Sequence, residues 1–553
     1  MNDPLLMADL MKATEALAAE RPLPQELHEA AGALNRSQLD LAKRLLTRFL
    51  AKHPNDPDAL HLMAQMAMTT ERPGEAESIL AKCVDRLPDF DLVRLNYAKT
   101  LHTLNKNKES LHHLERLMAK DPRSFLYRHT AALVLTGLGR HQEAADYYRR
   151  LTEDYPQMGL FWLRYADRLR AVGRKQNAIA AYRKVIELCP SLGGAYWSLA
   201  DLKTFRFSED EIATMETQLR QGDISAQNRT YFHFALAKAY ADKQLYGKAF
   251  EQYAKANALR RIGVDYDPDL LSEHVAACES FYSKDFFEQR SGSGLESDSA
   301  IFVVGMHRAG STLIEQILSS HSSVEGMGEA PEIPLLGRQL ENERAPAQGL
   351  GYPEVVGHLD AATLRQFGKE YVDSIAGRRK TTRYFFVDKN PFNLWFVGII
   401  HLILPKARIV DVRRHPMSCC FSNFTMNFGS GLYHTYRQSD LGRYYVNYVR
   451  MMAHYDRVLP NRIHRVTYER LVSDTEAEVR RLLNYIGLPF EDGCLQFHQT
   501  RRTVATPSSE QVRRPINDEG VNRWRNYEPW LGPLKAALGP VLDAYPNVPH
   551  FAD

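Results

Sequence analysis

The stretch IFVVGMHRAGSTLIEQILSSH, residues 301–321, decides the fold of the C-terminal half. It opens with four apolar residues in a row, a run typical of a strand buried in a parallel sheet. A loop bounded by Gly305 and Gly310 follows, and the apolar spacing of the residues after it predicts a helix. In such a unit the backbone N–H groups of the loop and the positive N-terminus of the helix bind an anion of phosphate size.

This loop lacks the lysine of a nucleoside triphosphate site. The pattern GxxxxGK[ST] requires a Lys directly after the second Gly. Ser311 takes that position here, and the cation lies inside the loop as Arg308. Ser311 and Thr312 add hydroxyl donors. The loop therefore predicts an anion site that differs from the site of magnesium-dependent triphosphate enzymes.

Two further apolar runs predict strands that are followed by charged residues. The run Ile409–Val412 leads to Arg414, and Ser422 follows eight residues later on an expected helix. The run in YFFVDKNP leads to Lys389. Open α/β sheets place their ligands beyond the carboxyl ends of their strands. We therefore expect Arg414 and Lys389 at the same edge of the sheet as the loop.

The loop GMHRAGSTL, the RHP segment with its serine, and DKNP together resemble the sulfotransferase superfamily, which uses 3′-phosphoadenosine 5′-phosphosulfate. The resemblance covers roughly residues 298 to 550. It extends to the protein-tyrosine sulfotransferase branch and to bacterial proteins that join tetratricopeptide repeats to such a domain. It implies transfer of a sulfuryl group to an acceptor hydroxyl without a metal ion.

The resemblance also implies a role for each matching residue. The residues that would bind the donor are Arg308, Ala309, Gly310, Ser311 and Thr312 for the 5′-phosphosulfate, and Arg414 and Ser422 for the 3′-phosphate. Glu329 matches the general base, Lys389 the lysine near the leaving phosphate, and Ser508 the serine near it. The chain departs from the family at His307, where a Pro is usual, and at Glu332, because the second acidic residue is usually next to the first.

The N-terminal half repeats every 34 residues. Prolines recur with this spacing at Pro54, Pro88, Pro122, Pro156 and Pro190. Two ladders of small residues share the spacing, namely Ala30, Ala64, Ala98, Ala132, Ala166 and Ala200, and Ala42, Ala76, Ser110, Ala144 and Ala178. Small residues let two helices cross closely, and proline ends a helix. The pattern resembles the tetratricopeptide repeat, with five clear repeats and a sixth, displaced by three residues, that contains Ala237, Ala249 and Ala256.

Composition limits the classes of partner and the compartment. The 553 residues include 70 basic and 67 acidic ones, so the net charge of 70 − 67 = +3 argues against a nucleic-acid-binding or membrane surface. The sequence contains no apolar run of about 18 residues and no basic segment of the signal-peptide type. Its six cysteines form no CxxC pair. We therefore expect a cytoplasmic chain with no membrane span, no nucleic-acid partner and no structural zinc.

Together these patterns predict two domains. Residues 1–290 form an all-α tetratricopeptide solenoid, and residues 298–553 form an α/β P-loop-like sulfotransferase domain with a mostly parallel central sheet. The predicted acceptor bears a hydroxyl, with a tyrosine of a protein or peptide bound by the solenoid as one candidate. Two alternatives stay open. One is a P-loop kinase, which the missing loop lysine disfavours; the other is a repeat scaffold with an inactive domain, which the full set of site residues disfavours.

Overall fold

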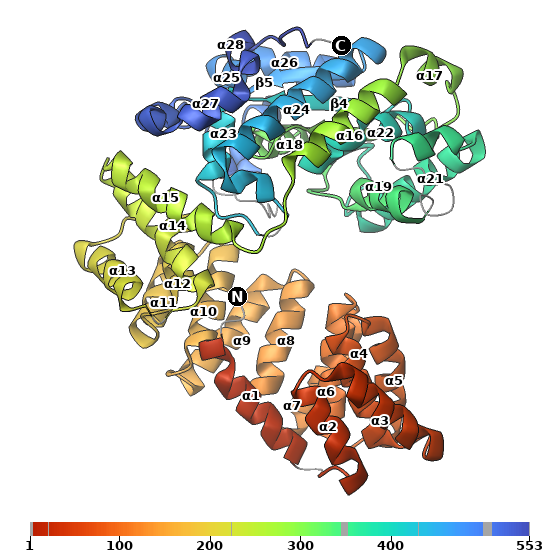
Figure 1. The fold of residues 1–553 in the computed structure, drawn as a ribbon, viewed down its shortest axis with the longest axis vertical. Helices are drawn as coiled ribbons and strands as arrows, with labels where there is room; N and C mark the ends of the chain where they lie inside the picture. The colour runs from red at the N-terminus through yellow and green to blue at the C-terminus, as the bar shows by residue number, and fades with distance from the viewer. Residues whose placement is uncertain are drawn as a thin grey trace. The chain divides into compact units, whose positions relative to one another are not determined.

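A computed structural model describes residues 4–19, 22–222, 224–343, 352–429, 431–500 and 511–551 (Figure 1). The chain divides into two compact units. The first comprises Met1–Asp201 and Thr214–Ile224, and the second comprises Leu202–Ala213 and Ser225–Asp553. Each unit is described by itself below.

The first unit is a series of helix pairs. It begins with α1 (Pro4–Ala19) and the short helix η1 (Gln25–Leu27). The pairs are α2 (His28–Asn35) with α3 (Leu39–Lys52), α4 (Pro57–Thr69) with α5 (Pro73–Arg86), α6 (Asp91–Thr103) with α7 (Asn107–Lys120), α8 (Phe125–Gly137) with α9 (His141–Asp154), and α10 (Gly159–Ala171) with α11 (Lys175–Leu188). Helix α12 (Gly193–Asp201) follows, and α13 (Glu209–Gln221) is divided between the two units.

The ladders of small residues have the place that the sequence predicts for them. Every member of the first ladder lies on the first helix of a pair or on α12, every member of the second lies on a second helix, and all of them are buried. Each ladder proline lies two residues beyond the end of a second helix. Because every pair repeats the same close helix crossing, the predicted helical repeat is confirmed.

The second unit contains two more repeat-like helices before its sheet. These are α14 (Ala226–Asp242) and α15 (Tyr246–Arg261), followed by α16 (Pro268–Phe281) and α17 (Lys284–Gln289). The five strands are β1 (Ala300–Val304), β2 (Val324–Gly326), β3 (Phe385–Asp388), β4 (Arg408–Arg413) and β5 (Ile463–Thr467).

Helices connect and follow the strands. The α-helices are α18 (Ser311–Ser319), α19 (Glu332–Glu343), α21 (Ala361–Arg378), α22 (Val397–Ile403), α23 (Pro416–Phe424), α24 (Gln438–Val458), α25 (Tyr468–Ser473), α26 (Thr475–Ile486), α27 (Gly532–Leu538) and α28 (Pro540–Ala544). The short 3₁₀ helices are η2 (Glu354–His358), η3 (Pro391–Phe396), η4 (Tyr433–Tyr436), η5 (Asp492–Cys494), η6 (Phe497–Gln499), η7 (Gln511–Arg513) and η8 (Arg523–Trp530).

The sheet is parallel in every described strand pair, with the order β2-β3-β1-β4-β5. Phe302 of the central strand lies opposite Asp388 on one side and Ile409 on the other. All five residues of β1 are buried, which explains the continuous apolar run in the sequence. Since the chain moves in opposite directions along the sheet after β1 and after β3, right-handed connections assign α18 to one face and α22 to the other. The predicted α/β fold with a parallel sheet is confirmed.

The division between the two compact units falls within residues 202–225, whereas the change from helical periodicity to a linker and strand predicts a division at residues 290–298. The division into compact units reflects packing, whereas the predicted limits reflect the sequence pattern. The predicted domain limits therefore stay a prediction. In the described part of the chain, no helix is both long enough and apolar enough to cross a membrane. All six cysteines are free thiols.

Candidate active site

The predicted site residues lie at the edge of the sheet where the strands end. Gly305 follows β1, Lys389 follows β3 and Arg414 follows β4. Glu329 lies in the short segment after β2, and Tyr468 follows β5. Because the strands are parallel, their carboxyl ends share one edge of the sheet. The fold therefore gathers segments that are far apart in the sequence.

The loop after β1 requires glycine at both of its ends. Gly305 has a φ of 132°, and a Cβ atom there would lie 2.5 Å from the carbonyl oxygen of Val412. Gly310 has a φ of 111°, and a Cβ atom there would lie 2.7 Å from the ring of Tyr468. A side chain at either position would meet both backbone strain and a steric clash. The loop therefore packs closely against β4 and the start of α25.

The residues after the loop arginine form the start of α18. Ala309, Ser311 and Thr312 are buried, and Ser311 and Thr312 are the first two residues of the helix. The backbone N–H groups of the first turn have no partner within a helix, and the helix dipole is positive there. These positions suit the predicted contacts with an anionic group.

The arginine of the loop contacts the predicted serine of the second phosphate site. Arg308 donates a hydrogen bond from Nε to Ser422 Oγ at 3.1 Å. The backbone of Arg308 has a φ of 65°, in the left-handed region that non-glycine residues seldom adopt. The structure therefore brings together two predicted donor-binding residues that are 114 positions apart.

Arg414 binds the backbone of the same loop. Its Nη1 donates to the carbonyl oxygen of Arg308 at 3.0 Å, and its Nη2 donates to the carbonyl oxygen of Gly520. Its guanidinium lies 4.6 Å from the ring centroid of Tyr468. Arg414 therefore joins the loop of residues 305–310, which we call the donor loop after its predicted role, to the chain that precedes η8.

Two of the three predicted catalytic residues, Glu329 and Lys389, form an ion pair. The carboxylate of Glu329 accepts a hydrogen bond from Lys389 Nζ. The side chain of Lys389 is 1% exposed and that of Glu329 is 47% exposed. The backbone explains the contact, because the N–H of Lys389 donates to the carbonyl oxygen of Gly328 at 2.9 Å. The segment after β2 is thereby fixed against the end of β3.

Glu332, the second acidic residue of this segment, has other partners. Its carboxylate accepts hydrogen bonds from Arg378 at 2.8 Å and from Ser374 at 2.9 Å, both on α21. Two carboxylates three residues apart thus have different partners. Glu329 is the one that contacts the buried lysine.

Ser508 lies outside the described residues, so its predicted role stays a prediction. The described chain resumes at Gln511, whose side chain accepts a hydrogen bond from Arg308 Nη2 at 3.2 Å. This contact places Gln511 beside the donor loop.

Asn423, which no motif in the sequence singles out, anchors the loop. Asn423 is fully buried, and its Nδ2 donates to the carbonyl oxygen of His307 at 2.7 Å. Burial, together with the charges of Lys389 and Arg308, lowers the pKa of His307 to about 3, so this histidine is neutral at physiological pH. In the sequence, only the position of Asn423 next to Ser422 could have indicated that Asn423 belongs to the site.

Asp388, the residue before Lys389, is a buried carboxyl group whose protonation makes the stability of the fold depend on pH. Burial raises its pKa to about 7 from an ordinary value of 3.8, and it accepts a hydrogen bond from the hydroxyl of Tyr371 at 2.9 Å. Because the folded state holds this proton more tightly than the unfolded state, the contribution of Asp388 to stability is complete below pH 3.8 and is lost as the pH rises to about 7.

We expect Asp388→Asn to remove this loss, because an amide stays neutral and still accepts from Tyr371. In the parent, the group lowers the free energy of unfolding by up to about 1.4 kcal/mol for each pH unit in that interval. Urea unfolding at several pH values measures the difference between variant and parent. If the free energy of unfolding changed with pH equally in the variant and the parent, the role of Asp388 would be contradicted.

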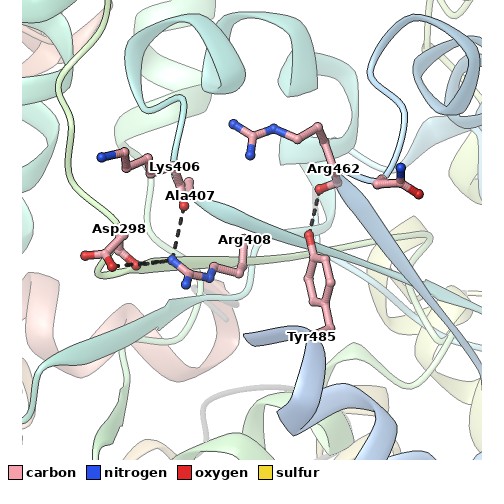
Figure 2. A pocket seen from close by; sticks show the side chains of 7 residues that line it. Asp298, Lys406, Ala407, Arg408, Arg462 and Tyr485 are labelled. Carbon is pink, nitrogen blue, oxygen red and sulfur yellow. Dashed lines mark hydrogen bonds and ion pairs between the residues drawn. The ribbon is translucent and has the colours of Figure 1, made fainter. Parts of the chain in front are cut away.

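A separate pocket lies at the opposite edge of the sheet. It has a volume of about 380 Å³, and Figure 2 shows several of its lining residues, among them Asp298 before β1, Arg408 at the start of β4 and Arg462 before β5. These are the amino ends of the strands, so the pocket contains none of the predicted site residues. Over the described residues, no group of three or more His, Cys, Asp or Glu side chains is arranged to hold a metal ion.

Two family models match parts of this chain. Residues 300–492 match the model of the sulfotransferase family, and residues 98–158 and 129–192 match a tetratricopeptide repeat model. The sheet domain is a sulfotransferase-family domain. The match covers all five strands, and with them the donor loop, Glu329, Lys389, Arg414 and Ser422 of this sulfotransferase domain.

Individual relatives are distant. An uncharacterized protein of Aquifex aeolicus is 30% identical over 342 residues, which are 60% of this chain and 44% of the relative. This chain thus spans less than half the length of that relative. Protein-tyrosine sulfotransferase 1 of Danio rerio is 23% identical over 283 residues, which are 45% of this chain and 74% of the relative. Among solved structures, the sulfotransferase domain of the Synechococcus PCC 7002 olefin synthase has a TM-score of 0.32 at 16% identity, covering 42% of this chain and 88% of that one.

Proposed function

We propose that the chain transfers a sulfuryl group from 3′-phosphoadenosine 5′-phosphosulfate to an acceptor hydroxyl. The observation that carries the proposal is the arrangement at the carboxyl edge of the sheet, where Arg308, Ser422 and Arg414 adjoin one another. The Glu329–Lys389 pair lies at the same edge. Cations beside a glycine-bounded loop suit a nucleotide that carries two anionic groups, and a carboxylate beside a buried lysine suits transfer from that nucleotide to a hydroxyl.

The residues at this edge fit the donor. The loop and the start of α18, Arg308 through Thr312, would hold the 5′-phosphosulfate with backbone N–H groups and hydroxyls. Arg414 and Ser422 would hold the 3′-phosphate. The lysine that a triphosphate site requires after Gly310 is absent, because Ser311 occupies its position. This difference favours a sulfotransferase over a P-loop kinase.

Glu329 would act as the general base. It would accept the proton of the acceptor hydroxyl as that oxygen forms a bond to sulfur and the bond from sulfur to the phosphate oxygen breaks. Lys389 and Arg308 would stabilise the negative charge that the departing phosphate gains, and Ser508 is predicted to lie near it. The proton ends on Glu329 and the bonding electrons on the nucleotide.

The ion pair between Glu329 and Lys389 suggests how donor binding prepares the base. A lysine with 1% side-chain exposure needs an anionic partner, and Glu329 is that partner in this structure. A bound phosphosulfate would supply the negative charge instead. Glu329 would then be released from Lys389 to face the acceptor.

Two measurements test the proposal. Calorimetry should show that adenosine 3′,5′-bisphosphate binds without magnesium, and that ATP with magnesium binds far more weakly; the reverse order would favour a kinase. Transfer of labelled sulfate to tyrosine peptides, saccharides, lipids or small phenols would then show turnover and the acceptor class. Nucleotide binding without transfer to any of them would favour the inactive scaffold.

We propose further that the solenoid selects the acceptor, with a tyrosine of a protein or peptide as the leading candidate. A repeat array presents a concave surface suited to peptides. The fragment from residue 202 to the C-terminus contains the whole second unit. It should therefore bind nucleotide as the parent does, yet show a raised KM for the native acceptor with kcat unchanged, because remote binding that is equal in ground and transition states affects KM alone. Steady-state kinetics of both proteins provides the test. An unchanged KM would remove the recognition role.

A further inference from the structure

Helix α15 belongs to the repeats by sequence but to the sulfotransferase domain by packing. Ala237 on α14 and Ala249 on α15 are 12 positions apart, the same spacing that separates the two ladders in each earlier repeat. Yet both helices lie in the compact unit that contains the sheet. Within that unit α15 contacts η4 and η8. Packing of the repeat therefore accounts for only one side of α15.

We propose that α15 is a positioning element of the donor site, acting through Asn257 and Arg260 on the end of α23. The inference rests on the proposed function, since it concerns the nucleotide that Arg308, Arg414 and Ser422 are proposed to bind. Asn257 and Arg260 are positioning residues, because each acts through other groups and neither is placed against the nucleotide.

Asn257 binds the C-terminus of α23. It is 2% exposed, and its Nδ2 donates to the carbonyl oxygen of Phe424 at 2.9 Å. Phe424 is the last residue of α23, and the carbonyl groups of the last turn of a helix have no partner within it. An amide from a helix 167 positions earlier in the chain thus satisfies this carbonyl group.

Arg260, one turn further along α15, holds the chain that follows α23. Its Nη2 donates to the carbonyl oxygen of Gly429 and to the hydroxyl of Tyr436, each at 2.8 Å. Its Nη1 donates to the side chain of Asn427. The guanidinium also lies over the ring of Tyr436, 5.0 Å from its centroid. One side chain therefore fixes three points of this segment.

Aromatic stacking joins α15 to the same region. The ring of Phe250 is stacked on Phe424 at 5.8 Å and on Trp530 at 5.9 Å between centroids. Tyr246 meets Tyr527 edge to face at 5.2 Å. Both Tyr527 and Trp530 belong to η8, which follows the Gly520 carbonyl group that Arg414 holds.

These contacts end next to the groups that hold the donor loop. Ser422, which accepts from Arg308, and Asn423, which donates to the carbonyl oxygen of His307, are the two residues before Phe424. A shift at the end of α23 would therefore move both of them. Because binding groups must be held within about 0.5 Å of their working geometry, loss of this support should weaken donor binding.

Asn257→Ala and Arg260→Lys test the inference in the full chain, with Lys255→Ala as the matched control. Lys255 lies on the same helix, is exposed and forms an ion pair with Glu251, one turn earlier on that helix. We expect Asn257→Ala to raise the Kd for adenosine 3′,5′-bisphosphate and the donor KM about fivefold to thirtyfold, with the acceptor KM unchanged. Arg260→Lys keeps the charge but loses the fork of donors, and should give a smaller effect in the same direction. The control should match the parent.

Hydrogen exchange separates positioning from general destabilisation. In Asn257→Ala, amides of residues 305–310 and 416–424 should exchange faster while those of β5 keep their protection. Should that variant not fold, Arg260→Lys carries the same readouts. Donor affinity equal to the parent in a folded variant, or a uniform loss of protection, would overturn the inference and leave the proposed function intact. A parent that does not bind the nucleotide would overturn both.

Discussion

Glu329→Gln should reduce turnover about a hundredfold or more while donor binding is kept. The amide preserves the shape of the side chain but cannot accept the hydroxyl proton, and general-base catalysis typically contributes about 10²- to 10⁴-fold. Lys389 also loses the carboxylate with which it pairs in this structure. We therefore expect a Kd for adenosine 3′,5′-bisphosphate that is equal to that of the parent or lower. Single-turnover transfer of labelled sulfate, together with calorimetry, measures both quantities.

Glu332→Gln is the matched control for this experiment. The two glutamates lie in the same short segment, but Glu332 pairs with Arg378 and Ser374 on α21. Its replacement should leave turnover within a few-fold of the parent. If Glu332→Gln lost activity and Glu329→Gln kept it, the base would be assigned to the wrong carboxylate.

The sequence predicts the local structure of this protein well, because local structure follows from periodicity and from a few special residues. The 34-residue spacing of small residues and prolines predicts the helix pairs and their ends. The apolar run before Gly305 predicts a buried parallel strand, and glycines at 305 and 310 are required by close approaches to Val412 and Tyr468. Residues that directly follow strands, such as Lys389 and Arg414, are gathered by the topology of a parallel sheet.

The contacts that complete the site come from packing between distant segments, which spacing does not encode. Asn257 and Arg260 look like ordinary residues of a repeat helix, and only the folded chain shows that they bind the segment after Ser422. The choice between Glu329 and Glu332 likewise depends on which carboxylate reaches Lys389 and which reaches α21. The resemblance assigns the base to Glu329, but only the folded chain shows that Glu329 and Glu332 have different partners.

Arg414→Ala and Arg308→Ala should each weaken binding of adenosine 3′,5′-bisphosphate by about 1.5 to 3 kcal/mol, the range for hydrogen bonds to charged groups. The larger effect is expected for Arg414→Ala. This substitution removes a cation and also releases the carbonyl oxygens of Arg308 and Gly520, which the guanidinium holds together. Arg308→Ala removes the bonds to Ser422 and Gln511 but leaves the loop anchored by Asn423.

Arg480→Ala is the control, because Arg480 forms an exposed ion pair with Glu476 on α26 and is not part of the site. Calorimetry at two salt concentrations provides the measurement. The parent should lose affinity as salt rises, since free ions screen the attraction between the guanidinium groups and the anionic nucleotide. Each site variant should show a smaller dependence on salt, having lost one of the charges that is screened. Unchanged affinity in both Arg308→Ala and Arg414→Ala would mean that the nucleotide binds elsewhere. A loss of affinity in Arg414→Ala alone would mean that the loop backbone, which Arg414 binds, contributes more to nucleotide binding than the Arg308 side chain does.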